Sequence, residues 1–133
     1  MDEAVWTTSS GAPAWLRETG LELDGAGFIR VDETLRALAH PDIFAAGDVA
    51  SLPDPRPKAG VFAVRQGPVL AQNIRRCLSR EPLLAFRPQH AWLALISLSD
   101  GRTIADKWGM AVCGRWVSEW KHRNDTRFVR RYS

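Results

Sequence analysis

The chain has 133 residues, of which 45% are hydrophobic and 25% are charged, and its formal net charge at pH 7 is +3. These fractions are ordinary for a soluble globular protein, and the length suits one domain. The longest apolar runs are far shorter than the roughly 20 residues of a membrane-spanning helix. The acidic start lacks the basic and apolar regions of a signal peptide.

The two cysteines, Cys77 and Cys113, lie far apart and form no C-x-x-C pair. This spacing implies neither a disulfide scaffold nor a dithiol redox centre. We therefore expect a cytoplasmic protein with reduced thiols.

The first half of the chain carries short strand patterns. Residues 4–8 and 28–31 each predict a short strand. The apolar run Ile43–Ala46 is too short for a helix and is bounded by a proline and by Gly47-Asp48. It predicts a buried strand that ends in a tight turn.

Asp48 is the first candidate for a functional side chain. Its carboxylate follows the predicted strand at the carboxyl end, which is where open α/β sheets bind ligands. The alternative is that Asp48 only caps the turn or a following helix. The local pattern alone leaves both readings open.

The second half changes from a helical to a strand pattern and back. Residues 51–58 are rich in proline and predict an extended loop. A helix should follow from about Gly60 to Ser79, with a kink or a restart at Pro68. The later elements are expected as strands over 92–98, 103–108 and 109–114, a hairpin turn at 99–102 and a helix over 115–132.

Phe44-Ala45-Ala46-Gly47-Asp48 is one of four segments that occur in order over about the first half of the chain. It resembles the second flavin-binding motif of the pyridine nucleotide–disulfide oxidoreductase superfamily of flavoproteins. The flanking segments resemble the "ATG-x-P" return (5–8 and 11–13), the "G-x-I-x-V-D" strand (27–32) and the helix start beneath the flavin (58–67).

The resemblance implies a binding role for six residues. Asp48 would accept a hydrogen bond from a ribityl hydroxyl of FAD, and Gly47 would let the backbone come close. The backbone of Ala59, Gly60 and Val61 would stabilise negative charge at the N1/O2 edge of reduced flavin, as helix amino ends do. Lys58 would add its ammonium to this effect, and the alternative is a solvated loop lysine. No residue is assigned a catalytic role.

The family also carries nucleotide-binding G-x-G-x-x-G turns, and this sequence has none. Gly25-Ala26-Gly27 lacks the third glycine and precedes a strand. We therefore expect an α+β or α/β fragment of a longer enzyme, which would need a missing N-terminal nucleotide-binding half and be inactive alone. Residues 1–82 would be the C-terminal part of an FAD/NAD(P)-binding domain, with short strands and a long helix. Residues 83–133 would be an interface domain with a small antiparallel sheet and a C-terminal helix.

The implied function is transfer of hydride from NAD(P)H to FAD and then to a second acceptor. Type II NADH dehydrogenases show "A-Q-x-A-x-Q-Q-G" at this helix, and here Val61 and Arg65 replace the first two glutamines. Residues 58–71, the strand that begins at Trp92 and the tail with Trp116 and Trp120 together look most like an NADH dehydrogenase-like module. That module is sometimes fused to selenide, water dikinase. The acceptor is left open, and no side-chain spacing indicates a metal site.

Residues 115–132 alternate aromatic and basic side chains at helical spacing. Such a helix can lie in a membrane interface as a peripheral contact, or it can form a homodimer contact, or it can pack on its own domain. No recognised module supports nucleic-acid binding. A non-catalytic module, in which the flavin motif survives as scaffold and the tail binds a partner, remains the alternative to the oxidoreductase.

Overall fold

A computed structural model describes residues 10–132, so the strand expected over residues 4–8 and part of the "ATG-x-P" segment lie outside the described residues. The chain divides into two compact units, Met1–Pro88 and Gln89–Ser133. Helices and strands occur in both units, as expected for an α+β chain.

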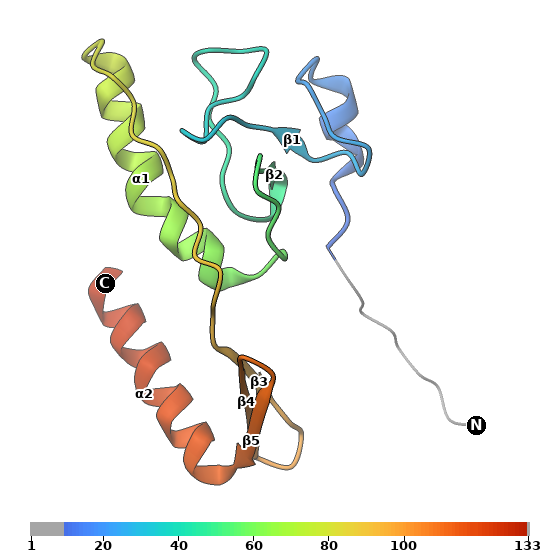
Figure 1. The fold of residues 1–133 in the computed structure, drawn as a ribbon, viewed down its shortest axis with the longest axis vertical. Helices are drawn as coiled ribbons and strands as arrows, with labels where there is room; N and C mark the ends of the chain where they lie inside the picture. The colour runs from blue at the N-terminus through green and yellow to red at the C-terminus, as the bar shows by residue number, and fades with distance from the viewer. Residues whose placement is uncertain (1–9, 133) are drawn as a thin grey trace. The chain divides into compact units, whose positions relative to one another are not determined.

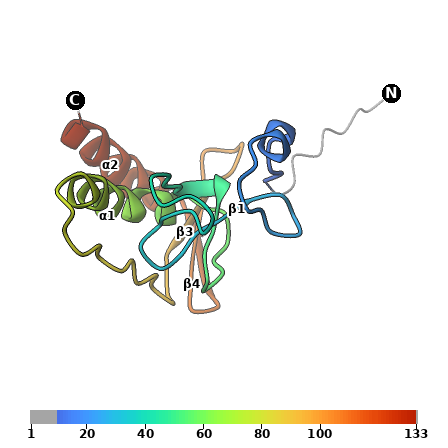
Figure 2. The same ribbon diagram turned by 90° about the horizontal axis from the view of Figure 1, so that it is seen from above.

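The first unit is built around two short parallel strands. Strand β1 (Ile29–Arg30) pairs with β2 (Ala50–Ser51), with Ile29 opposite Ala50. Two short 3-10 helices also belong to this unit: η1 (Ala14–Glu18) comes before β1 in the chain, and η2 (Gly47–Val49) runs directly into β2. In both views the β1–β2 pair lies between η1, in blue, and helix α1 (Figures 1 and 2).

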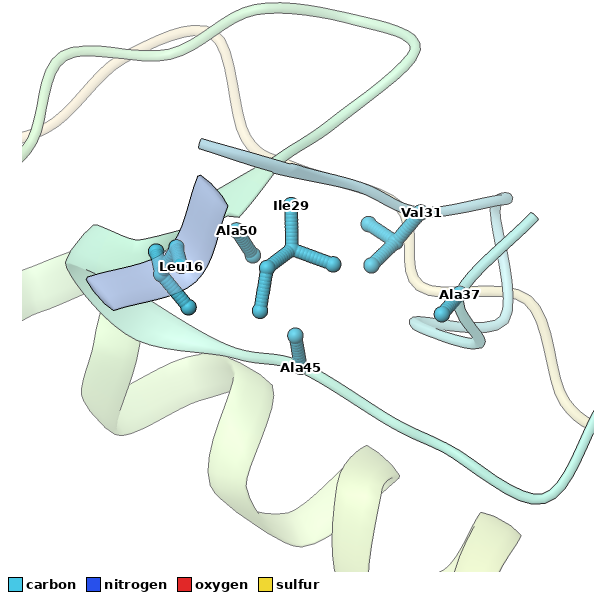
Figure 3. Packing of buried hydrophobic residues seen from close by; sticks show 6 residues of the cluster. All are labelled: Leu16, Ile29, Val31, Ala37, Ala45 and Ala50. Carbon is cyan, nitrogen blue, oxygen red and sulfur yellow. The ribbon is translucent and has the colours of Figure 1, made fainter. Parts of the chain in front are cut away.

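The core of this unit is small and comes from several segments. Ile29 projects from β1 into a cluster beside β2 (Figure 3). Burying side chains of this size contributes about 1.5–3 kcal/mol each. The buried members of the cluster are Leu16, Ile29, Val31, Ala37, Ala45 and Ala50.

The predicted strand over Ile43–Ala46 is wrong. Only Phe44 forms an isolated bridge, with Arg36, and Ile43 is 39% exposed. The neighbouring segment contains Leu35 in the left-handed region, at φ 68°. A regular ladder needs extended backbone on both sides, so this residue prevents one. The strand of this region is β2, which begins after the turn that contains Asp48.

Helix α1 (Gly60–Leu78) agrees with the predicted boundaries. Its preceding residue, Ala59, is extended and provides no side-chain cap. The helix passes through Pro68 without restarting. A proline inside a helix removes one backbone donor, but α1 remains helical on both sides of Pro68.

After α1 the chain returns along the helix in an extended segment (Figure 1). Asn73 of α1 is fully buried and holds this segment. Its Nδ2 donates to the carbonyl oxygens of Thr34 and Leu84, both at 2.8 Å, and its Oδ1 accepts from the Leu84 amide at 2.8 Å. The amide of Phe86 donates to the Glu33 carbonyl at 2.7 Å.

These bonds tie Leu84 and Phe86 to the first unit, which ends at Pro88. The predicted domain ranges, residues 1–82 and 83–133, stay a prediction. The identity of the two parts as a nucleotide-binding portion and an interface domain stays a prediction.

The second unit is a three-stranded antiparallel sheet with one helix. Strands β3 (Ala94–Ser97), β4 (Thr103–Lys107) and β5 (Met110–Gly114) follow one another in the sheet. Helix α2 (Arg115–Tyr132) begins directly after β5 and contacts β4 and β5. Its Val117 is completely buried. The expected small sheet and C-terminal helix are confirmed.

Neither α1 nor α2, nor any other helix in the described part of the chain, combines the length and apolar character that crossing a membrane requires.

We predict that Asn73→Ala lowers the free energy of unfolding by about 2–4 kcal/mol, because it leaves buried backbone groups of the returning segment without partners. Urea unfolding followed by circular dichroism measures the change. Gln72→Ala, at the exposed neighbouring position, is the matched control and should change stability by less than about 0.5 kcal/mol. Equal stability of the two variants would contradict the role given to Asn73.

Candidate functional site

An open pocket lies within the first unit, where three segments that are distant in the sequence meet. Its volume is about 190 Å3. Ligand pockets that enclose a whole small molecule are larger, at roughly 300–1,000 Å3. The pocket is therefore too small to enclose a ligand of that size by itself. Its lining includes Asp24, Phe28, Gly47, Asp48, Lys58 and Ala59.

Four of the six residues selected from the sequence line this pocket. Gly47 and Asp48 come from η2, while Lys58 and Ala59 come from the loop before α1. The other two, Gly60 and Val61, follow as the first residues of α1 and do not line the pocket. The fold brings Gly47, Asp48, Lys58 and Ala59 together. The role of all six residues toward a cofactor stays a prediction.

The η2 turn presents an exposed carboxylate. Gly47 has φ +72°, a left-handed conformation that favours glycine, and it lies against α1. Asp48 is exposed, and the hydroxyl of Ser10 donates to its Oδ2 at 3.4 Å. A carboxylate in this position can accept hydrogen bonds from a ligand hydroxyl.

The turn is fastened to α1 by a residue that sequence reasoning missed. The amide of Gly47 donates to Oε1 of Gln66 at 2.5 Å, and Gln66 is only 2% exposed. Gln66 belongs to residues 58–67, the segment that resembles the helix start beneath the flavin. Nothing in its local pattern indicated a partner in the earlier turn.

Lys58 is held by the protein itself. Its Nζ donates to the Ala50 carbonyl at 2.5 Å and lies 4.0 Å from the centre of the Phe28 ring. Burial lowers the pKa of Lys58, and the carboxylates of Asp24 and Asp48 oppose that shift. Lys58 is thus a half-buried loop lysine with contacts of its own, and its role toward a cofactor stays a prediction.

Asp24 is a second acidic group of the pocket that the sequence did not single out. Its Oδ1 accepts from the amides of Ala26 and Phe28, each at 2.9 Å. Burial acts to raise the pKa of Asp24, but the hydrogen bonds from Phe28, Ser51 and Ala26 outweigh it and hold the pKa below its ordinary value. Only the fold brings Asp24 to the same pocket as Lys58.

The amino end of α1 contributes backbone donors beside the pocket. Ala59 does not cap the helix with a side chain, and the amide of Phe62 bonds to the Ala59 carbonyl at 3.0 Å. The first amides of a helix have no intrahelical acceptor and form the positive end of its dipole. Because Ala59 and Ala63 are small, a ligand can approach this end closely.

The second unit carries a separate aromatic surface. Trp116 and Trp120 of α2 are 62% and 42% exposed and border a shallow surface hollow with Glu119 and Arg123. Contact of residues 115–132 with a membrane or a partner stays a prediction. Within residues 10–132, no group of three or more His, Cys, Asp or Glu side chains is arranged to hold a metal ion.

Two comparisons with known proteins concern the part of the chain that builds the pocket. Residues 2–67 match the sequence model of the family described as Pyridine nucleotide-disulphide oxidoreductase. The alternative NAD(P)H-ubiquinone oxidoreductase C1, chloroplastic/mitochondrial, of Arabidopsis thaliana is 38% identical over 74 residues. That alignment covers 53% of this chain and 14% of the plant protein, so the chain spans a small part of this relative's length.

We predict that the stability advantage of the wild-type chain over Asp24→Asn depends on pH. The pKa of Asp24 is lowered in the folded chain, below its ordinary 3.8. Its charge therefore stabilises the fold above that value, and the stabilisation is lost as pH falls through the folded pKa. Asparagine retains a side-chain oxygen for the turn but no charge. Urea midpoints should differ at neutral pH and converge by about pH 2–3, whereas a pH-independent difference would contradict this assignment.

Proposed function

We propose that this chain, whose two matches support membership of the pyridine nucleotide-disulphide oxidoreductase family, supplies one wall of the FAD site of an NAD(P)H oxidoreductase. The observation that carries the proposal is that the Gly47-Asp48 turn meets Lys58 and Ala59, the two residues before α1, in one pocket. The pocket volume of about 190 Å3 is too small for a whole dinucleotide. The remaining walls would come from a further part of a longer protein.

Asp48 is the residue that would orient the cofactor's sugar-alcohol chain. An ionised carboxylate only accepts hydrogen bonds, so it suits a ligand hydroxyl that donates. The carboxylate is exposed at the pocket, with one long contact to Ser10. Gly47 leaves no side chain between the backbone and the ligand.

The start of α1 would stabilise charge. When bound, FAD accepts a hydride from NAD(P)H and passes electrons to a second acceptor. The amides of Gly60 and Val61 lie at the positive end of α1 and would favour negative charge on the reduced ring. The ammonium of Lys58 adds positive potential from its fixed position over Phe28.

The acceptor is not part of the proposal. Ubiquinone appears in the name of the plant relative, whose length this chain covers by 14%. Val61 and Arg65 also stand where type II NADH dehydrogenases have glutamines. The association with selenide, water dikinase stays a prediction, since neither match concerns it.

We predict that Asp48→Ala weakens FAD binding at least about tenfold, because the ligand hydroxyl loses a charged acceptor. Since one wall binds weakly, FAD should be lost on desalting, and equilibrium dialysis read by flavin absorbance is the suitable measurement. Asp42→Ala, in the exposed turn before η2, is the matched control and should bind FAD as the wild type does. Equal affinity of Asp48→Ala and Asp42→Ala would count against the proposed site.

A further inference from the structure

We propose that Gln66 is a positioning residue that sets the place of the Asp48 carboxylate relative to the amino end of α1. The inference rests on the proposed function, because it concerns how Asp48 is placed in the proposed FAD site. Its structural basis is the hydrogen bond between Gly47 and Gln66. Nothing in the family resemblance assigned a role to this side chain.

Gln66 is buried although it is polar. It is 2% exposed, and its Oε1 accepts from the Gly47 amide at 2.5 Å. The residue before this turn, Ala46, provides no side-chain cap. The carboxamide of Gln66 therefore acts as a cap for η2, because its oxygen accepts a hydrogen bond from the amide at the start of the turn.

A second contact attaches the same turn to the same face of α1. A Cβ placed on Gly47 would lie 3.4 Å from Cβ of Ala63, so the turn and the helix are in close packing. Ala63 and Gln66 are three residues apart and share a helix face. The turn is thus fixed by a packing contact and a hydrogen bond on neighbouring helix turns.

The position of Asp48 depends on the attachment of the turn to α1, because its own side chain makes only a weak contact. Its one hydrogen bond within residues 10–132, from Ser10, is 3.4 Å long and exposed. Its position is therefore determined by the backbone of the turn. Since Gly60 and Gln66 belong to one rigid helix, the bond at Gln66 also fixes the distance between the carboxylate and the first amides of α1.

The first test needs no cofactor. Gln66→Met keeps the length and apolar stem of the side chain but removes the acceptor oxygen. Hydrogen exchange followed by NMR should show the Gly47 amide exchanging at least about tenfold faster, with α1 amides unchanged. Gln66→Glu should restore protection at pH 8, because it keeps an acceptor at the same distance. Gln72→Met, at an exposed position of α1, is the matched control. Unchanged exchange at Gly47 in Gln66→Met would overturn the proposal.

The second test joins Gln66 to FAD. If Gln66 acts through Asp48, Gln66→Met and Asp48→Ala should each weaken FAD binding, and the double variant should bind no more weakly than Asp48→Ala alone. Additive losses would contradict action through Asp48. If Asp48→Ala leaves FAD affinity unchanged while Gly47 exchange responds to Gln66→Met, the proposed cofactor site fails, and the attachment of the turn stands.

Discussion

The first unit depends on the attachment of the Gly47–Val49 turn to α1. The turn lies between two elements that are fixed by different forces. On one side, the parallel pairing of Ile29 with Ala50 and the small apolar cluster hold the strands. On the other, Gln66 holds the turn to the helix through the Gly47 amide. Because Asp48 lies between these attachments, the backbone places its carboxylate, which within residues 10–132 accepts only the long hydrogen bond from Ser10.

Charge in the pocket is balanced within the protein. The ammonium of Lys58 is held by the Ala50 carbonyl and the Phe28 ring, and the carboxylates of Asp24 and Asp48 stabilise its charge. Burial alone would favour a neutral lysine. The two carboxylates differ in availability, since hydrogen bonds from its own loop engage Asp24, whereas Asp48 faces solvent. This difference suits Asp48, rather than Asp24, to contact a ligand.

Local patterns predicted much of the fold and part of the site. The boundaries of α1, the order of the three antiparallel strands and the start of α2 follow from hydrophobic period and turn residues. The strand over Ile43–Ala46 was predicted wrongly because a left-handed Leu35, which no local pattern signals, faces it. The partners of Asn73 and Gln66 lie far away in the sequence, so periodicity contains no information about them. The six candidate site residues came from family resemblance, and the meeting of four of them in one pocket required the fold.

The most direct test of the central claim is a map of FAD contacts on this chain. An isotopically labelled sample would be titrated with FAD to about 1 mM, a range in which weak binding is visible, while amide chemical shifts are followed by NMR. The account predicts shifts concentrated at Gly47, Asp48, Gly60 and Val61, with the β3–β5 sheet unaffected. Shifts that avoid the Gly47-Asp48 turn and the start of α1, or no shifts at all, would contradict it.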